Sequence, residues 1–151
     1  MVQTLLVPRP ASGPRAALPP VRVVLFFDGS PADLAHVDEL VLDFPGGGFI
    51  CMGPGCHEER LRFWARRFGR GQTSASSRHR AVVSVDYGKS PEYPYPWAIE
   101  ECFDLYLAIV ESNGAVLGLK PADEGRQLEL VLTGDSACVP CLRFPCCSSE
   151  R

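Results

Sequence analysis

Two apolar runs that end in glycine-containing turns constrain the fold of this chain more than any other feature. The first run, Leu40–Phe44, leads into Pro45–Phe49, and the second, Leu128–Leu132, leads into Thr133–Ala137. Each run has the length and composition of a buried strand. Glycines at the end of a strand let backbone N–H groups approach a ligand closely, because no Cβ stands in the way. A serine on a tight turn after a strand can present its hydroxyl above the sheet, where a base can activate it.

Apolar strands alternate with amphipathic stretches along the rest of the chain. Further strands are predicted at Val21–Phe27 and Ala81–Asp86. The stretches His57–Arg70 and Trp97–Asn113 place apolar residues at helical spacing, which predicts two amphipathic helices. This alternation predicts an α/β fold with a doubly wound, mostly parallel sheet, whose functional loops lie at the carboxyl ends of the strands. Both glycine-containing turns follow such ends, so we expect them to meet at one edge of the sheet.

Length and composition favour one soluble globular domain. The 151 residues suffice to bury a sizeable core, and the apolar fraction of 46% and charged fraction of 22% are ordinary. A net charge of −3 argues against nucleic-acid binding, and no apolar run reaches the roughly 18–20 residues of a membrane span. The N-terminus lacks the pattern of a secretory signal. We therefore expect a cytoplasmic protein whose seven cysteines are mostly free thiols.

Three segments are expected to lie outside the regular elements. Residues 1–20 contain five prolines and are predicted to be disordered or extended. Gly71–Arg80 is small, polar and aperiodic, which predicts a flexible loop. Residues 138–151 form an atypical tail without helical periodicity. Its cysteines lack the spacing of a closed ligand set, so we predict no metal site there. They are Cys138, Cys141, Cys146 and Cys147.

Other patterns have simple structural explanations. The arginines of the first predicted helix are better explained as a solvated face than as a binding patch. The glycines between Gly46 and Gly53 have the wrong spacing for a dinucleotide loop, and no acid is placed to bind a ribose. We therefore predict no cofactor. Taken alone, the glycine run fits a structural turn equally well.

Three motifs follow one another along the chain: Gly46–Phe49, Asp86–Pro96 and Gly134–Ala137. Together they resemble the His-Gly-Gly-Gly loop, the Asp-Tyr-x-x-x-Pro-Glu-x-x-x-Pro segment and the Gly-Asp-Ser-Ala-Gly elbow of the hormone-sensitive-lipase-like branch of the α/β-hydrolases. The resemblance covers residues 21–137 and implies the amino-terminal half of such a domain.

The resemblance also implies a role for each motif residue. Ser136 would be the nucleophile of a carboxylesterase or lipase-like serine hydrolase, acting on a small-molecule acyl ester. The N–H groups of Gly47, Gly48 and Ala137 would form the oxyanion hole. The Asp-Tyr segment would have a structural role.

The chain departs from the family pattern in several places. Pro45 stands where the family has a histidine, and Cys138 replaces the last glycine of the elbow. In this fold the triad runs Ser, acid, His, yet no histidine follows Ser136. We therefore expect a truncated or misread, inactive form that lacks the downstream half of the domain. The alternative is a non-catalytic binding remnant that keeps the oxyanion loop. The strand before Ser136 would then expose an apolar edge, through which we expect self-association.

Overall fold

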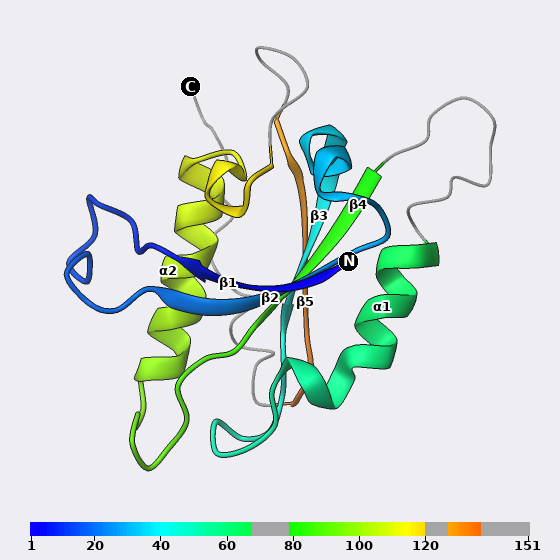
Figure 1. The fold of residues 1–151 in the computed structure, drawn as a ribbon. Coiled ribbons are helices and arrows are strands. Elements are labelled where there is room, and N and C mark those ends of the chain that lie inside the picture. Colours follow the sequence, from blue (N-terminus) through cyan, green and yellow to red (C-terminus); the bar gives the residue numbers. More distant parts are fainter. Residues whose placement is uncertain (68–78, 120–126, 137–151) are drawn as a thin grey trace.

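A five-stranded mixed sheet with a helix on each face forms the centre of the molecule (Figure 1). The computed structural model describes residues 1–67, 79–119 and 127–136. The strands are β1 (Val2–Val7), β2 (Val21–Phe27), β3 (Val37–Phe44), β4 (His79–Val85) and β5 (Glu129–Gly134), and the helices are α1 (Glu58–Arg67) and α2 (Trp97–Glu111). Short 3-10 helices are η1 (Pro31–His36), η2 (Pro54–His57) and η3 (Ala115–Leu117).

The sheet has a parallel and an antiparallel part. Its strand order is β1-β2-β4-β3-β5. β3 lies between β4 and β5 and is parallel to both, while β2 is antiparallel to β1 and β4. Parallel neighbours need crossover connections, and α1 and α2 lie in the connections from β3 to β4 and from β4 to β5. The expected α/β class is thus confirmed, and its parallel part is limited to the three strands that the two helices connect.

The amino-terminal residues differ from the sequence prediction. Where a disordered or extended segment was expected over residues 1–20, Val2–Val7 forms the edge strand β1, paired with β2 along its whole length. Most of its side chains are exposed, so the strand lacks the apolar alternation that identified the others. The five prolines all follow β1, in turns that return the chain to β2. The ordered domain therefore begins at β1 rather than at residue 21.

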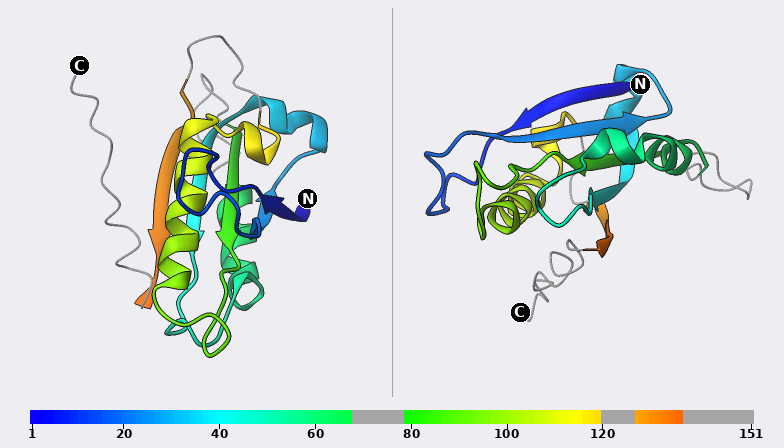
Figure 2. Two further views of the ribbon diagram at one scale, coloured as in Figure 1. Left: turned by 90° about the vertical axis from the view of Figure 1, so that its left-hand side faces the viewer. Right: turned by 90° about the horizontal axis from the view of Figure 1, so that it is seen from below.

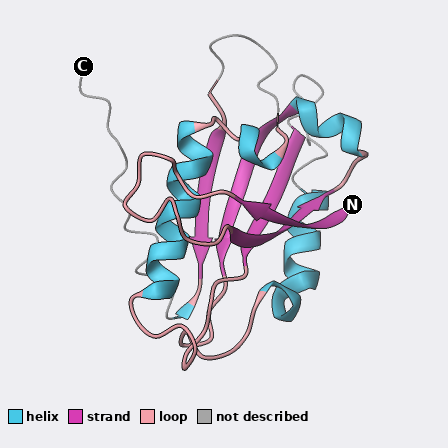
Figure 3. Ribbon diagram, turned by 60° about the vertical axis from the view of Figure 1, so that its left-hand side comes forward, coloured by secondary structure: helices cyan, strands magenta, loops and turns pink. Residues whose placement is uncertain are grey.

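The helices cover opposite faces of the sheet (Figures 2 and 3). The larger apolar cluster lies between the sheet and α2, and the smaller one lies between the sheet and α1. β3 contributes to both, with Leu40 and Leu42 on the α2 face and Val41 on the α1 face. Strand alternation places Asp43 on the α1 face as well, where it is completely buried. A charged residue in such a place needs polar partners.

The remaining predictions concern element ends, cysteines and the segments outside the described residues. α2 matches the predicted helix closely. α1 begins one residue after the predicted start at His57, and residues 68–70 of that prediction lie outside the described residues. The described cysteines, Cys51, Cys56 and Cys102, are free thiols. Most of the predicted flexible loop, Gly71–Arg80, and all of the tail, residues 138–151, lie outside the described residues. Among the helices of the described part of the chain, none combines the length and the apolar character that a membrane crossing requires.

Candidate functional site

The glycine loop, Gly46–Gly48, meets the turn after β5 at the carboxyl edge of the parallel strands. Phe44 at the end of β3 pairs with Gly134 at the end of β5, so the two chains leave the sheet side by side. A Cβ on Gly46 would lie 2.2 Å from Asp135 Oδ1 and 3.1 Å from the Cβ of Ser136. A larger residue at this position would require the Asp135 side chain to move and would crowd the turn that follows β5. The structure thus brings the two turns together, as the sequence analysis expected.

The conformation of the glycine loop leaves backbone donors available. Gly47 has a φ of 109°, and its carbonyl oxygen accepts the N–H groups of Ile50 and Cys51, each at 3.1 Å. A Cβ on Gly47 would lie 2.1 Å from the Cys51 carbonyl oxygen, so no other residue fits this turn. Gly48 is exposed and faces open space. The N–H groups of Gly47 and Gly48 donate no hydrogen bond to any residue that the structure describes. Two unpaired N–H groups on a rigid turn can bind a developing negative charge.

Ser136 lies on a strained turn directly after β5. Its side chain is exposed, and its φ of 50° is in the left-handed region that residues with a Cβ rarely adopt. Strain of this kind persists where the surrounding structure enforces it, and it recurs at functional sites. A sharp turn after a strand, with an exposed serine, is the local geometry of a nucleophile elbow. Ala137, the third predicted oxyanion donor, lies outside the described residues, as does Cys138.

A cluster of charged side chains lies beneath this turn. Arg60 of α1 contacts Asp135 Oδ2 through Nη1 at 3.2 Å and Asp43 Oδ1 through Nη2 at 3.4 Å. Ser84 of β4 donates its hydroxyl to Asp43 Oδ2 at 2.7 Å. Burial raises the pKa of Asp43, although the Ser84 hydrogen bond and the charge of Arg60 oppose that shift. Arg60 therefore links the end of β3 to the residue that precedes Ser136.

Sequence reasoning missed Arg60 and Asp43. Arg60 was counted among the solvated arginines of the helix, whereas its guanidinium lies 5.0 Å from the ring centroid of Trp64 and joins two carboxylates. The available signal was Asp43 itself, a charged residue inside an otherwise apolar strand, which required a cation or hydroxyl partner on the α1 face.

The second motif segment holds the glycine loop in place. The buried hydroxyl of Tyr87 donates to the carbonyl oxygen of Pro45 at 2.6 Å and lies 3.0 Å from that of Gly46. The N–H group of Ser90 donates to the Phe49 carbonyl at 2.9 Å, and the rings of Phe49 and Tyr87 meet edge to face. Pro45, which replaces the family's histidine, therefore still provides a backbone acceptor that fixes the loop.

The three histidines differ in their distance from this edge. His36 precedes β3 and His79 begins β4, so both lie at the amino ends of parallel strands, opposite the glycine loop. His57 ends η2, directly before α1, with Nε2 3.8 Å from Asp135 Oδ2. Within the described residues, no three His, Cys, Asp or Glu side chains form a group that could bind a metal ion.

Known proteins that resemble the chain are hydrolases. The family model described as alpha/beta hydrolase fold matches residues 41–138. A hormone-sensitive lipase of Ictidomys tridecemlineatus is 35% identical over 107 residues, which cover 71% of this chain and 12% of that lipase. An esterase of Acinetobacter venetianus is 30% identical over 102 residues, which cover 68% of this chain and 27% of that protein.

Solved structures show the same relationship. An esterase of Pyrobaculum calidifontis superposes with a TM-score of 0.63 at 25% identity, over 91% of this chain and 36% of the esterase. The chain thus spans much less than half the length of each of these relatives. The motif resemblance is confirmed, and the chain belongs to the hormone-sensitive-lipase-like branch of the α/β-hydrolase fold family.

Proposed function

We propose that the protein is a carboxylic ester hydrolase in which Ser136 is the nucleophile and the N–H groups of Gly47, Gly48 and Ala137 bind the oxyanion. The contact between Gly46 and the Asp135–Ser136 turn carries this proposal. It brings an exposed, strained serine and two N–H groups that donate to no described residue to one edge of the sheet. The relatives' names, lipase and esterase, support the same reaction class.

The chemistry defines what these groups contribute. Attack of the Ser136 hydroxyl on an acyl carbonyl forms a tetrahedral intermediate, and the proton leaves to a base. Each preorganised oxyanion donor is worth about 3–4 kcal/mol in the transition state. A serine without a base is a weak nucleophile, and no histidine follows Ser136 in these 151 residues. We therefore propose that turnover needs an acid and a histidine from outside them.

The test compares ester hydrolysis by the 151-residue chain with that by its Ser136→Ala variant. With short p-nitrophenyl esters, we expect the two rates to be equal. A faster rate in the unsubstituted chain that Ser136→Ala abolishes would support the nucleophile but contradict the need for an outside base. His57→Gln would then show whether His57 acts as that base, because it is the histidine nearest the elbow.

A second candidate function is binding without turnover. It is favoured by the N–H groups of Gly47 and Gly48, which donate to no described residue, and by a turn that Ile50 and Cys51 close through the Gly47 carbonyl.

The exposed outer edge of β5 provides a separate route to assembly, because among the described residues β5 pairs with β3 alone and Val131 is 39% exposed. We propose that chains of these 151 residues self-associate through this edge. A monomer with one sharp thermal transition at low micromolar concentration, measured by sedimentation and calorimetry, would contradict self-association.

A further inference from the structure

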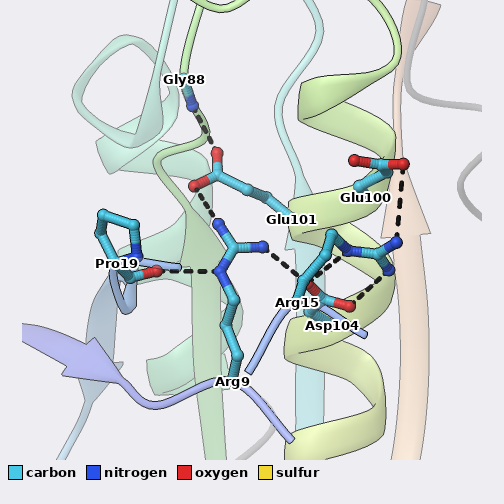
Figure 4. A network of polar contacts seen from close by, with 7 residues as sticks. All are labelled: Arg9, Arg15, Pro19, Gly88, Glu100, Glu101 and Asp104. Atoms are coloured by element: carbon cyan, nitrogen blue, oxygen red, sulfur yellow. Dashed lines mark hydrogen bonds and ion pairs between the residues drawn. The ribbon is translucent and has the colours of Figure 1, made fainter. Parts of the chain in front are cut away.

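A buried arginine attaches the amino-terminal arm, Pro8–Pro20, to α2 (Figure 4). The side chain of Arg9 is 1% exposed. Its Nη1 donates to Asp104 at 2.6 Å, its Nη2 donates to Glu101 at 3.2 Å, and its Nε donates to the carbonyl oxygen of Pro19 at 2.8 Å. The two carboxylates lie about one turn apart on α2 and so face the same arginine.

Glu101 connects Arg9 to the segment that holds the glycine loop. Its Oε1 binds Arg9, while its Oε2 accepts the N–H group of Gly88 at 2.6 Å. Gly88 directly follows Tyr87, whose hydroxyl binds the carbonyls of the glycine loop. A Cβ on Gly88 would lie 2.6 Å from the ring of Tyr93, so this backbone is closely packed and has little room to shift.

We propose that Arg9 is a positioning residue for the glycine loop. It fixes the Glu101 carboxylate, which fixes the Gly88 N–H group and with it the Tyr87 hydroxyl that orients Gly46. The inference relies on the proposed function only for the role of the loop as an oxyanion site. The contacts themselves do not depend on catalysis.

Electrostatics explain why Arg9 is needed for this arrangement. Burial raises the pKa of Glu101, while the Gly88 N–H group and the charge of Arg9 oppose that shift. Without Arg9, a buried carboxylate would keep one hydrogen bond from Gly88 and lose its opposite charge. Such a group is stabilised by moving toward solvent or by taking up a proton. Either change weakens the hydrogen bond between the Gly88 N–H group and Glu101.

Arg15 provides a matched control on the same arm. It binds Asp104 through two hydrogen bonds, of 2.6 and 2.9 Å, and approaches Glu100 at 3.5 Å. Within the described residues, these contacts of Arg15 do not extend to Glu101 or Gly88. Loss of Arg15 should therefore weaken the arm without disturbing the glycine loop.

The test is hydrogen–deuterium exchange of the 151-residue chain at low micromolar concentration, read by mass spectrometry. The peptide Gly46–Met52 contains the N–H groups of Ile50 and Cys51, which bind the Gly47 carbonyl. Arg9→Met should speed its exchange about tenfold, the effect of losing one net hydrogen bond to a charged group. Tyr87→Phe should do the same, Arg9→Lys should restore part of the protection, and Arg15→Met should leave the peptide within about twofold.

The peptide Val37–Leu42 of β3 separates a local effect from general destabilisation. Because this central strand exchanges only when the domain unfolds globally, labelling times are chosen at which Val37–Leu42 stays protected in every variant. The proposal requires that Gly46–Met52 exchanges faster in Arg9→Met at those labelling times. Unchanged exchange of Gly46–Met52 at those labelling times, equal effects of Arg9→Met and Arg15→Met, or no protection of Gly46–Met52 in the unsubstituted chain would each overturn the proposal. None of these results bears on Ser136 as the nucleophile, so the two proposals fail independently.

Discussion

Arg9 and Arg60 each bridge two carboxylates, but their surroundings differ. The side chain of Arg9 is 1% exposed and lies beneath the amino-terminal arm, whereas that of Arg60 is 35% exposed and lies beside the elbow. Removing one partner of a buried ion pair leaves an uncompensated charge, whereas an exposed pair is screened by water. The buried contacts of Arg9 are therefore expected to contribute more to stability than the partly exposed contacts of Arg60.

Replacing Arg9 should have the largest effect. Arg9→Met should lower the free energy of unfolding by about 3 kcal/mol, because it leaves Glu101 without an opposite charge and Asp104 with only Arg15. Urea unfolding measures this change. Arg22→Met is the control, because Arg22 is 63% exposed and its pair with Asp86 should contribute less than about 1 kcal/mol. Equal losses in both variants would remove the distinction between buried and exposed pairs.

The next largest effect should come from acid, which weakens the contacts that Asp104 of α2 makes with Arg9 and Arg15. Burial alone would raise the pKa of Asp104, but the hydrogen bonds from Arg15 and Arg9 outweigh it and hold the pKa below its ordinary value. The native carboxylate thus binds a proton less readily than the unfolded one. Its contribution to stability is present above the unfolded pKa and is lost as the pH falls through the folded pKa. Urea titrations at a series of acidic pH values should show a shallower decline for Asp104→Asn.

The contribution of Asp43 to stability should, in contrast, increase as the pH falls. Its folded pKa is raised, so protonation on acidification favours the native state at this residue. Asp43→Asn should therefore steepen the acidic decline rather than flatten it. The same dependence of the unfolding free energy on acidic pH in both Asn variants would show that the two carboxylates do not differ as the structure indicates.

Replacing Arg60 should have a smaller effect on stability than replacing Arg9. Arg60→Met should cost about 1 kcal/mol, because the side chain is partly exposed and Ser84 still binds Asp43. It should also raise the pKa of Asp43 further, since it removes an opposing positive charge. Chemical unfolding and a carboxyl titration by NMR measure the two effects. Arg66→Met, at an exposed position of the same helix, is the control. A loss as large as that of Arg9→Met would contradict the comparison.

The smallest predicted effect concerns the turn at Ser136. Ser136→Gly should raise stability by about 0.5 kcal/mol, because glycine adopts a φ of 50° without the strain that a Cβ imposes. Ser136→Ala keeps the Cβ and should give no such gain. Thermal unfolding of the two variants measures the difference, and no difference between them would mean that the turn is not strained in solution.

The sequence predicted much of the fold because its signals were local. β2 and α2 match their predicted spans closely, since an apolar β-branched run and a helical stripe are properties of neighbouring residues. β1 escaped prediction because most side chains of this edge strand are exposed. The meeting of Gly46 with Asp135 was also predictable, because two parallel strands must end at the same edge of a sheet.

By itself, the sequence determined the α/β class, the family and the order of the motifs that form the candidate site. Only the tertiary structure decided which charges meet. Arg9 pairs with Glu101 and Asp104 across most of the chain, and Arg60 joins Asp43 to Asp135. Pairing between distant residues depends on which faces of helices and strands are packed together, so no local pattern encodes it. The same packing decided that Tyr87, rather than a side chain of the loop, anchors Gly46.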